Sequence, residues 1–184
     1  HRDIKTDGSP YVLAFYSGKL APSNPTCNFL TQDCDYTVEP MMITDECNPL
    51  VTLDNAKIVG NKLTAGGTDY VFPFDLPLME GINLHVDLYF TRLEASVTVS
   101  GGRVTSMQGI LGGAVPKQQI SDAVAAIPDE TWAGLPVDKA TVQTLLELLV
   151  VPDIDGDGDG ILESASIGIQ FTAIPGEIVG RTAD

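Results

Sequence analysis

Hydrophobic and polar residues alternate along much of this chain, and the alternation predicts a mainly β protein. Apolar residues occupy every even position from Ile82 to Phe90, which indicates a strand with one buried face. From Leu93 onward the apolar residues fall on odd positions instead. A bulge or bend near Thr91–Arg92 would explain this change of phase. Ser100–Arg103, with two glycines at its centre, then predicts a tight turn into the second strand of a hairpin.

Five other segments have strand character, and prolines limit where two of them can lie in a sheet. Pro40 and the prolines of 69–78 favour edge or non-central positions, because proline cannot donate to a β-ladder. A Gly-Asn pair predicts a hairpin turn within 56–67. The five segments are 11–18, 36–43, 56–67, 69–78 and 165–173.

Two segments repeat apolar residues at helical spacing instead. The first starts with Pro116 as its first helical residue and ends before Pro128, and the second has Asp138 as its N-cap and ends before Pro152. We expect both apolar stripes to pack in the core. The residues of the two stripes are Ile120, Val124 and Ile127, and Val142, Leu145, Leu146 and Leu149.

Together these elements predict an α+β fold that is mainly β: an antiparallel, β-sandwich-like sheet with two short helices packed on it. The length of 184 residues suits a single domain over 1–184. Within it we expect a loose N-terminal segment over 1–10 and a loop-rich, cysteine-containing segment over 19–50.

The charge excludes some partners. The formal net charge is −15 and there are only ten Lys and Arg residues, so binding to nucleic acid or to an anionic membrane surface is not expected.

The longest apolar run is 145–151, which is too short to span a bilayer. The chain begins at His1 with no signal peptide, so we expect either that a leader was removed or that this is a fragment of a longer precursor.

The three cysteines, Cys27, Cys34 and Cys47, lie in one irregular stretch without a CxxC motif or a nearby histidine. This favours a disulfide over a metal site, and a disulfide implies an oxidising compartment. We expect either Cys27–Cys34 or Cys34–Cys47, and we prefer Cys34–Cys47, because it would clip the strand containing Pro40 to the next loop. The third thiol would then be free or paired with another chain.

The stretch "DIDGDGDG" (153–160) places four aspartates at alternate positions. Counted from Asp155, the loop carries Asp155, Asp157 and Asp159 at positions 1, 3 and 5, and glycine at position 6. Ile161 at position 7 would offer its carbonyl, and Glu163 falls at position 9. This follows the first nine positions of an EF-hand loop, so the sequence predicts a Ca²⁺ site.

Position 12 of this loop is Ser166 and not the bidentate glutamate of a full EF-hand. The missing ligand would come from Asp153, from water or from a distant carboxylate. Because a strand and not a helix follows, the site is a helix–loop–strand site of weak to moderate affinity, suited to extracellular calcium. The loop resembles the DxDxDGxxD loops of thrombospondin type 3 and related extracellular calcium repeats.

A wider resemblance covers about two-thirds of the chain, through "LTAGG" (63–67), "GILGGAVPK" (109–117) and "PDIDGDGDGILESASIGIQFTAIPGEIVG" (152–180). These segments resemble uncharacterised secreted lipoproteins of myxobacteria and related bacteria. The resemblance implies export and surface anchoring through a lipidated cysteine upstream of His1, and it implies no activity.

No sequence motif of a known catalytic class is present. His85 beside Asp87 could act as a general base, although an exposed strand histidine is the more common case. An aromatic platform at Tyr70, Phe72 and Phe74, and a phosphate cradle at Gly109, Gly112 and Gly113, are further alternatives, for which packing and a bend are the commoner explanations.

We therefore expect a non-catalytic, calcium-stabilised binding or structural module that is secreted or lies on the outer cell surface. The alternatives are an extracellular hydrolase that uses carboxylates and a carrier of an apolar ligand, which a large cavity would favour. The sequence leaves open whether the module binds a protein partner or assembles with its own copies.

Overall fold

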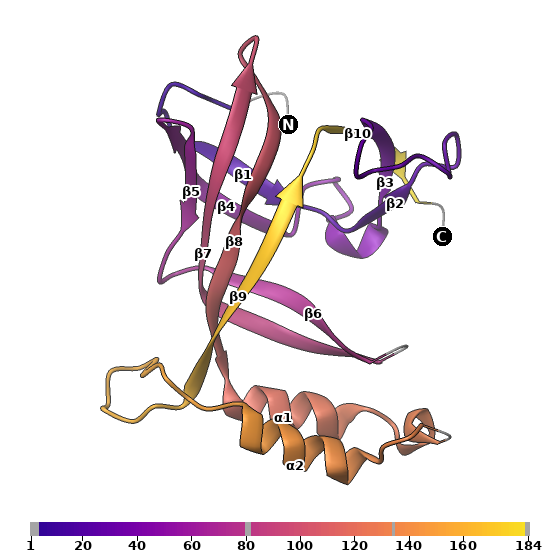
Figure 1. The fold of residues 1–184 in the computed structure, drawn as a ribbon, viewed down its shortest axis with the longest axis vertical. Coiled ribbons are helices and arrows are strands. Elements are labelled where there is room, and N and C mark those ends of the chain that lie inside the picture. Colours follow the sequence, from indigo (N-terminus) through magenta and orange to yellow (C-terminus); the bar gives the residue numbers. More distant parts are fainter. Residues whose placement is uncertain (1–3, 80–81, 134, 183–184) are drawn as a thin grey trace. The chain divides into compact units, whose positions relative to one another are not determined.

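The computed structural model describes residues 4–79, 82–133 and 135–182, and its content of 49% strand and 16% helix makes the fold mainly β (Figure 1). An antiparallel sheet with two helices packed on it confirms the predicted fold class. The elements are β1 (Tyr11–Phe15), β2 (Gly18–Leu20), β3 (Cys34–Val38), η1 (Pro40–Met42), β4 (Val51–Val59), β5 (Lys62–Gly66), β6 (Val71–Met79), β7 (Ile82–Ser100), β8 (Arg103–Pro116), α1 (Lys117–Ala126), η2 (Asp129–Trp132), α2 (Lys139–Leu149), β9 (Ser164–Ala173) and β10 (Gly176–Arg181).

The contacts within the chain form two compact units. Unit 1 contains 1–66, 92–111 and 169–184, and unit 2 contains 67–91 and 112–168. The unit boundaries fall inside β7, β8 and β9, so each of these long strands contributes residues to both units.

Unit 1 is built on strand pairing that the alternation and the turn residues predict. Strand β4 pairs antiparallel with β1 and β5, and β5 pairs with the second half of β7. Gly60 and Asn61 connect β4 to β5 with φ of 56° and 61°, as a two-residue hairpin turn of mirror-image type requires. The core side chains alternate along the strands and include Leu53, Ile58, Leu63, Leu93, Ala95 and Val97.

Unit 1 also holds a three-stranded sheet of order β10-β3-β2, in which β10 runs parallel to β3. The sequence patterns predict neither β10 nor the central position of β3, and the edge position expected from Pro40 is wrong. Strand β3 ends at Val38, and Pro40 instead begins the 3₁₀-helix η1, where its missing N–H removes no ladder hydrogen bond.

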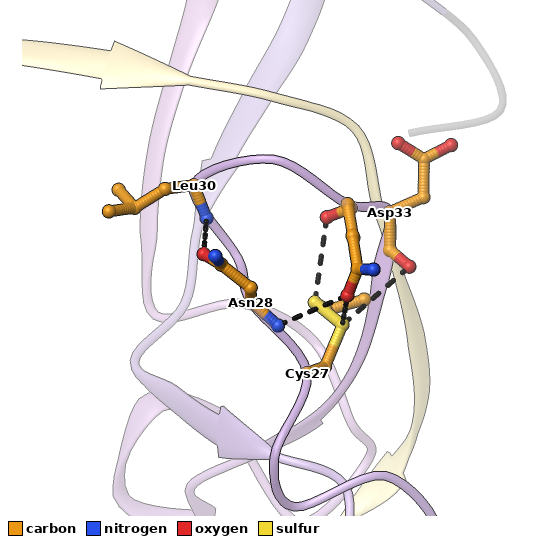
Figure 2. Close-up of a disulfide and its surroundings, with 6 residues drawn as sticks. Cys27, Asn28, Leu30 and Asp33 are labelled. Carbon is orange, nitrogen blue, oxygen red and sulfur yellow. Dashed lines mark hydrogen bonds between the residues drawn. A yellow bond between two sulfur atoms is a disulfide. The ribbon is translucent and has the colours of Figure 1, made fainter.

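The disulfide of unit 1 joins Cys27 to Cys34, with a Cα–Cα distance of 6.0 Å (Figure 2). The preferred Cys34–Cys47 pairing is therefore wrong, and the alternative pairing is confirmed. Cys34 is the buried first residue of β3, whereas Cys47 is a free, exposed cysteine in a turn after η1. The loop between the bonded cysteines is closed by local hydrogen bonds, in which Gln32 Oε1 accepts from the Asn28 N–H at 3.3 Å.

Unit 2 combines the hairpin of β6 and β7 with both helices. Among the described residues, strand β6 pairs with β7 alone, as its prolines predict for a non-central strand. Helix α1 packs against β7 through Gln119, whose amide exchanges hydrogen bonds with Asp87. Ile120 and Val124 are buried as predicted. Pro116 is the N-cap residue of α1 and not its first helical residue, because its ψ of 131° is still extended. Trp132, the only tryptophan of the chain, is buried in η2.

The predicted bulge lies at Phe90–Thr91. The even residues from Ile82 to Leu88 are buried, and burial then moves to Thr91 and the odd positions that follow. Phe90 has a φ of 55°, a left-handed conformation that is strained for a bulky side chain. The fully buried Thr91 hydroxyl donates to the Leu88 carbonyl and fixes the bend.

Helix α2 begins at its predicted N-cap, because the Asp138 carboxylate accepts from the Thr141 N–H at 2.7 Å. Its apolar stripe, however, is core only in part. Val142 is buried, but Leu145 and Leu149 are 48% and 75% exposed. Helix α1 covers only one side of α2, so the rest of the stripe remains on the surface of unit 2.

Candidate metal site in the aspartate loop

The loop between α2 and β9 lies in unit 2 and is closed at its base by a short antiparallel bridge between Ile154 and Ser164. The Ser164 carbonyl accepts from the Asp153 and Ile154 N–H groups at 2.9 and 3.0 Å, and the Ile154 carbonyl accepts from the Ser164 N–H at 3.2 Å. The Glu163 carbonyl also accepts from the N–H of Lys117, the first residue of α1, at 3.0 Å. Backbone hydrogen bonds therefore hold both ends of the loop in place.

Within this frame the structure brings four of the predicted ligands together. Asp155, Asp157, Asp159 and Glu163 each offer a carboxylate oxygen within 4.8 Å of the others, a group that could hold a metal ion. The three aspartates come from alternate positions of the loop, and Glu163 is the residue immediately before β9. The four residues of the DxDxDG-x-x-E spacing are thus the four that the structure brings together.

Backbone hydrogen bonds hold the carboxylates in this arrangement. Asp155 accepts from the Gly158 N–H at 2.7 Å with one oxygen and from the Gly160 N–H at 2.8 Å with the other. Asp157 accepts from the Asp159 N–H at 3.1 Å, and Asp159 accepts from the Ile161 N–H at 2.8 Å. Each carboxylate oxygen has a second lone pair, so these bonds leave it able to ligate a cation.

The same bonds favour the ionised form of Asp155. Donation from the Gly160 and then the Gly158 N–H holds the pKa of Asp155 below its ordinary value. Metal ligands must be deprotonated, and the lowered pKa keeps Asp155 ionised to a lower pH than an ordinary aspartate.

Two glycines suit the geometry of the loop. Gly160, at position 6, has a φ of 91°, which is the sharp turn expected there. A side chain at Gly156 would run into the Glu163 carboxylate, which accepts the Gly156 N–H, and would contact the ring of Phe90. Phe90 thus lies against the loop. The change of phase at 90–92 singles out the region of Phe90 in the sequence, but nothing in the sequence connects Phe90 with the aspartate loop.

Asp153 is the predicted ligand that the structure places elsewhere. One of its oxygens accepts from the Ser166 N–H at 2.7 Å and the other accepts from the Ser166 hydroxyl, so both face position 12 of the loop. The serine hydroxyl and then its N–H lower the pKa of Asp153. This carboxylate is not a member of the four-residue group and instead fixes the start of β9.

The other candidate residues have different partners. His85 Nδ1 lies 3.0 Å from Asp75 Oδ1 across the β6–β7 pair, and Asp87 pairs with Gln119 of α1, so His85 and Asp87 are not paired with each other. Both members of the His85–Asp75 pair are exposed on their side chains.

The predicted aromatic and glycine sites also have a structural explanation. Tyr70, Phe72 and Phe74 are all half-buried, as packing against the sheet requires. Gly109 and Gly113 lie inside β8, where a Cβ atom would overlap backbone of β7, so these glycines permit close strand approach and do not mark a bend.

The described helices are all too short or too polar to cross a membrane. Comparison with known proteins adds no identity: no family model, no curated protein and no solved structure matches this chain.

Proposed function

We propose that this chain is an extracellular or cell-surface module stabilised by one calcium ion, with a binding or structural role and no catalysis. The observation that carries the proposal is the convergence of Asp155, Asp157, Asp159 and Glu163 on a loop whose base is closed by the Ile154–Ser164 bridge. Four carboxylates held this close repel one another, and a divalent cation would remove the repulsion.

Calcium fits this ligand set better than other common divalent ions. All four side chains supply hard oxygen ligands, and neither histidine nor cysteine takes part, which disfavours zinc and copper. Magnesium requires a tight octahedral shell and keeps its waters, whereas calcium accepts six to eight oxygens from a flexible loop. We propose that the Ile161 carbonyl and water complete the shell.

Two features support an extracellular compartment. The Cys27–Cys34 disulfide favours an oxidising environment outside the cytoplasm. The position-12 glutamate is replaced by Ser166, which is engaged with Asp153, so affinity should fall in the range of extracellular modules, roughly 10⁻⁴–10⁻³ M. Such a site is filled only where free calcium is near millimolar.

The test is a calcium titration of the chelator-treated protein by isothermal titration calorimetry. We expect one site per chain and much weaker binding of magnesium. Glu163→Gln should weaken calcium binding at least about tenfold, because it removes one charged ligand. Glu130→Gln, which removes an acid of η2 outside the group, is the matched control and should leave the affinity unchanged. The proposal is rejected if calorimetry shows no saturable calcium binding, or if both variants lose the same amount of calcium affinity.

A further inference from the structure

Helix α2 presents a ridge of leucines that no other described residue of unit 2 covers. Leu145, Leu148 and Leu149 stand at positions i, i+3 and i+4 and therefore form one continuous ridge. Their exposed fractions are 48%, 70% and 75%. Single exposed leucines are ordinary, but a contiguous apolar ridge on a short surface helix marks an interaction surface.

The ridge borders a groove between the two helices and the end of the aspartate loop, all within unit 2. Figure 1 shows α1 and α2 side by side, with the loop leaving the end of α2. The groove has a volume of about 660 Å³ and is open to solvent, so it is not the enclosed cavity of a carrier. Its lining includes Ser121, Thr144, Glu147, Leu148, Leu162 and Glu163.

The surroundings of the groove are strongly acidic. Residues 112–168 contain ten Asp and Glu residues against Lys117 and Lys139, a net charge of −8. Both lysines already have partners within the chain. Lys117 Nζ donates to the Glu147 carbonyl at 2.8 Å, and Lys139 Nζ donates to the Ala125 and Ile127 carbonyls at 2.8 and 2.7 Å. The surface around the ridge therefore offers a partner mostly acidic side chains.

We propose that the leucine ridge and the adjoining groove form a docking site for a basic amphipathic helix of another protein. A helix with apolar residues at i, i+3, i+4 and i+7 would pack against the ridge, and Lys or Arg on its flanks would meet Glu147 and the acidic surface around the groove. Charge complementarity selects this occupant. A second copy of the chain would bring a net charge of −15 against −15, and an anionic membrane would be repelled as well.

This inference names a partner for the proposed binding module, and in that sense it rests on the proposed function. The ridge itself belongs to α2, however, whereas the ion would lie in the loop 155–163. Calcium binding without peptide, measured as above, therefore fails or succeeds independently of helix binding.

The experiment uses the whole chain in calcium-containing buffer and three labelled synthetic helices of about 15 residues. The first helix carries Leu on one face and Lys on the other, the second replaces Lys with Glu, and the third replaces Leu with Ala and keeps Lys. We expect fluorescence anisotropy to show micromolar binding of the Leu/Lys helix and at least about tenfold weaker binding of the other two. Raising NaCl from about 0.05 to about 0.5 M should weaken the Leu/Lys complex.

The surface is located with charge-neutral variants. Leu145→Gln combined with Leu148→Gln should weaken binding of the Leu/Lys helix at least about tenfold, because two apolar contacts are lost. Leu30→Gln is the matched control, since Leu30 is 74% exposed in the disulfide loop of unit 1, and it should bind as the original chain does. Circular dichroism of each variant verifies that α2 remains folded.

Three outcomes would overturn the proposal. The first is equal binding of the Leu/Lys and Ala/Lys helices, which would mean attraction by charge alone. The second is equal binding by the double variant and the original chain. The third is a different occupant. In that case sedimentation would show a dimer of the chain, or the chain would cosediment with phosphatidylcholine vesicles, and the double variant would lose this association.

Discussion

Removing calcium should lower the stability of the folded chain by an amount that the loop geometry sets. The four-carboxylate group lacks the twelfth-position ligand, because Ser166 is engaged with Asp153. We therefore take Kd as roughly 10⁻⁴ M. An ion that binds only the folded chain adds RT ln(1 + [L]/Kd), which is about 1.4 kcal/mol at a tenfold excess over Kd and about 2.7 kcal/mol at a hundredfold excess.

These free energies convert into a measurable shift. For a chain of this length, 1 kcal/mol changes Tm by about 2–4 °C, so a hundredfold excess of calcium should raise Tm by about 5–10 °C above the value in chelator. Differential scanning calorimetry over a calcium series should show Tm rising with the logarithm of the free concentration. Magnesium at the same concentration should produce a smaller shift.

The variant Asp157→Ala should abolish the shift while changing Tm in chelator only slightly. Its carboxylate is one of the four that could hold the ion, and its hydrogen bond from the Asp159 N–H is exposed and easily replaced by water. Asp45→Ala removes an exposed acid of unit 1 and is the control, which should keep the full calcium shift. Identical melting curves in calcium and in chelator, or a full shift in Asp157→Ala, would refute the reasoning.

Three further results are expected. Cys27→Ser should lower the free energy of unfolding in urea by about 2.4 kcal/mol, from the closed loop of sequence separation 7, whereas Cys47→Ser should change it little. Thr91→Val should cost about 1–2 kcal/mol in the same assay, because it leaves a carbonyl at the bulge without its donor. The hydrogen bond from the Thr141 N–H lowers the pKa of Asp138, so the ionised carboxylate stabilises the fold above its unfolded pKa of about 3.8. This stabilisation is lost as pH falls through the lower pKa of the folded state. Asp138→Asn should therefore make Tm between pH 2 and 5 less dependent on pH.

Local patterns in the sequence predicted the features that depend on local geometry. The alternation from Ile82 to Leu88 reports one sheet face directly, and Gly60–Asn61 fixes a hairpin by its backbone conformation alone. The aspartate loop belongs to the same class, since its ligand spacing encodes the positions of the carboxylates.

The features that were missed depend on contacts between distant segments. Asp153 binds Ser166 because the Ile154–Ser164 bridge brings them together, and the spacing within the loop carries no information about that bridge. The disulfide pairing depends on β3 beginning at Cys34. The stripe of α2 has the same spacing as a buried one, and only the fold reveals that the described part of unit 2 leaves Leu145 and Leu149 exposed.

Because Trp132 is buried in unit 2, its fluorescence is a probe of the folding of that unit. It is the only tryptophan, it is 7% exposed, and it lies in η2 of unit 2, so its emission reports the unfolding of the unit that also holds the aspartate loop. Far-ultraviolet circular dichroism reports the strands of both units. If the two signals change at the same urea concentration, the units unfold as one cooperative block; separate midpoints would make unit 2 an independent folding module.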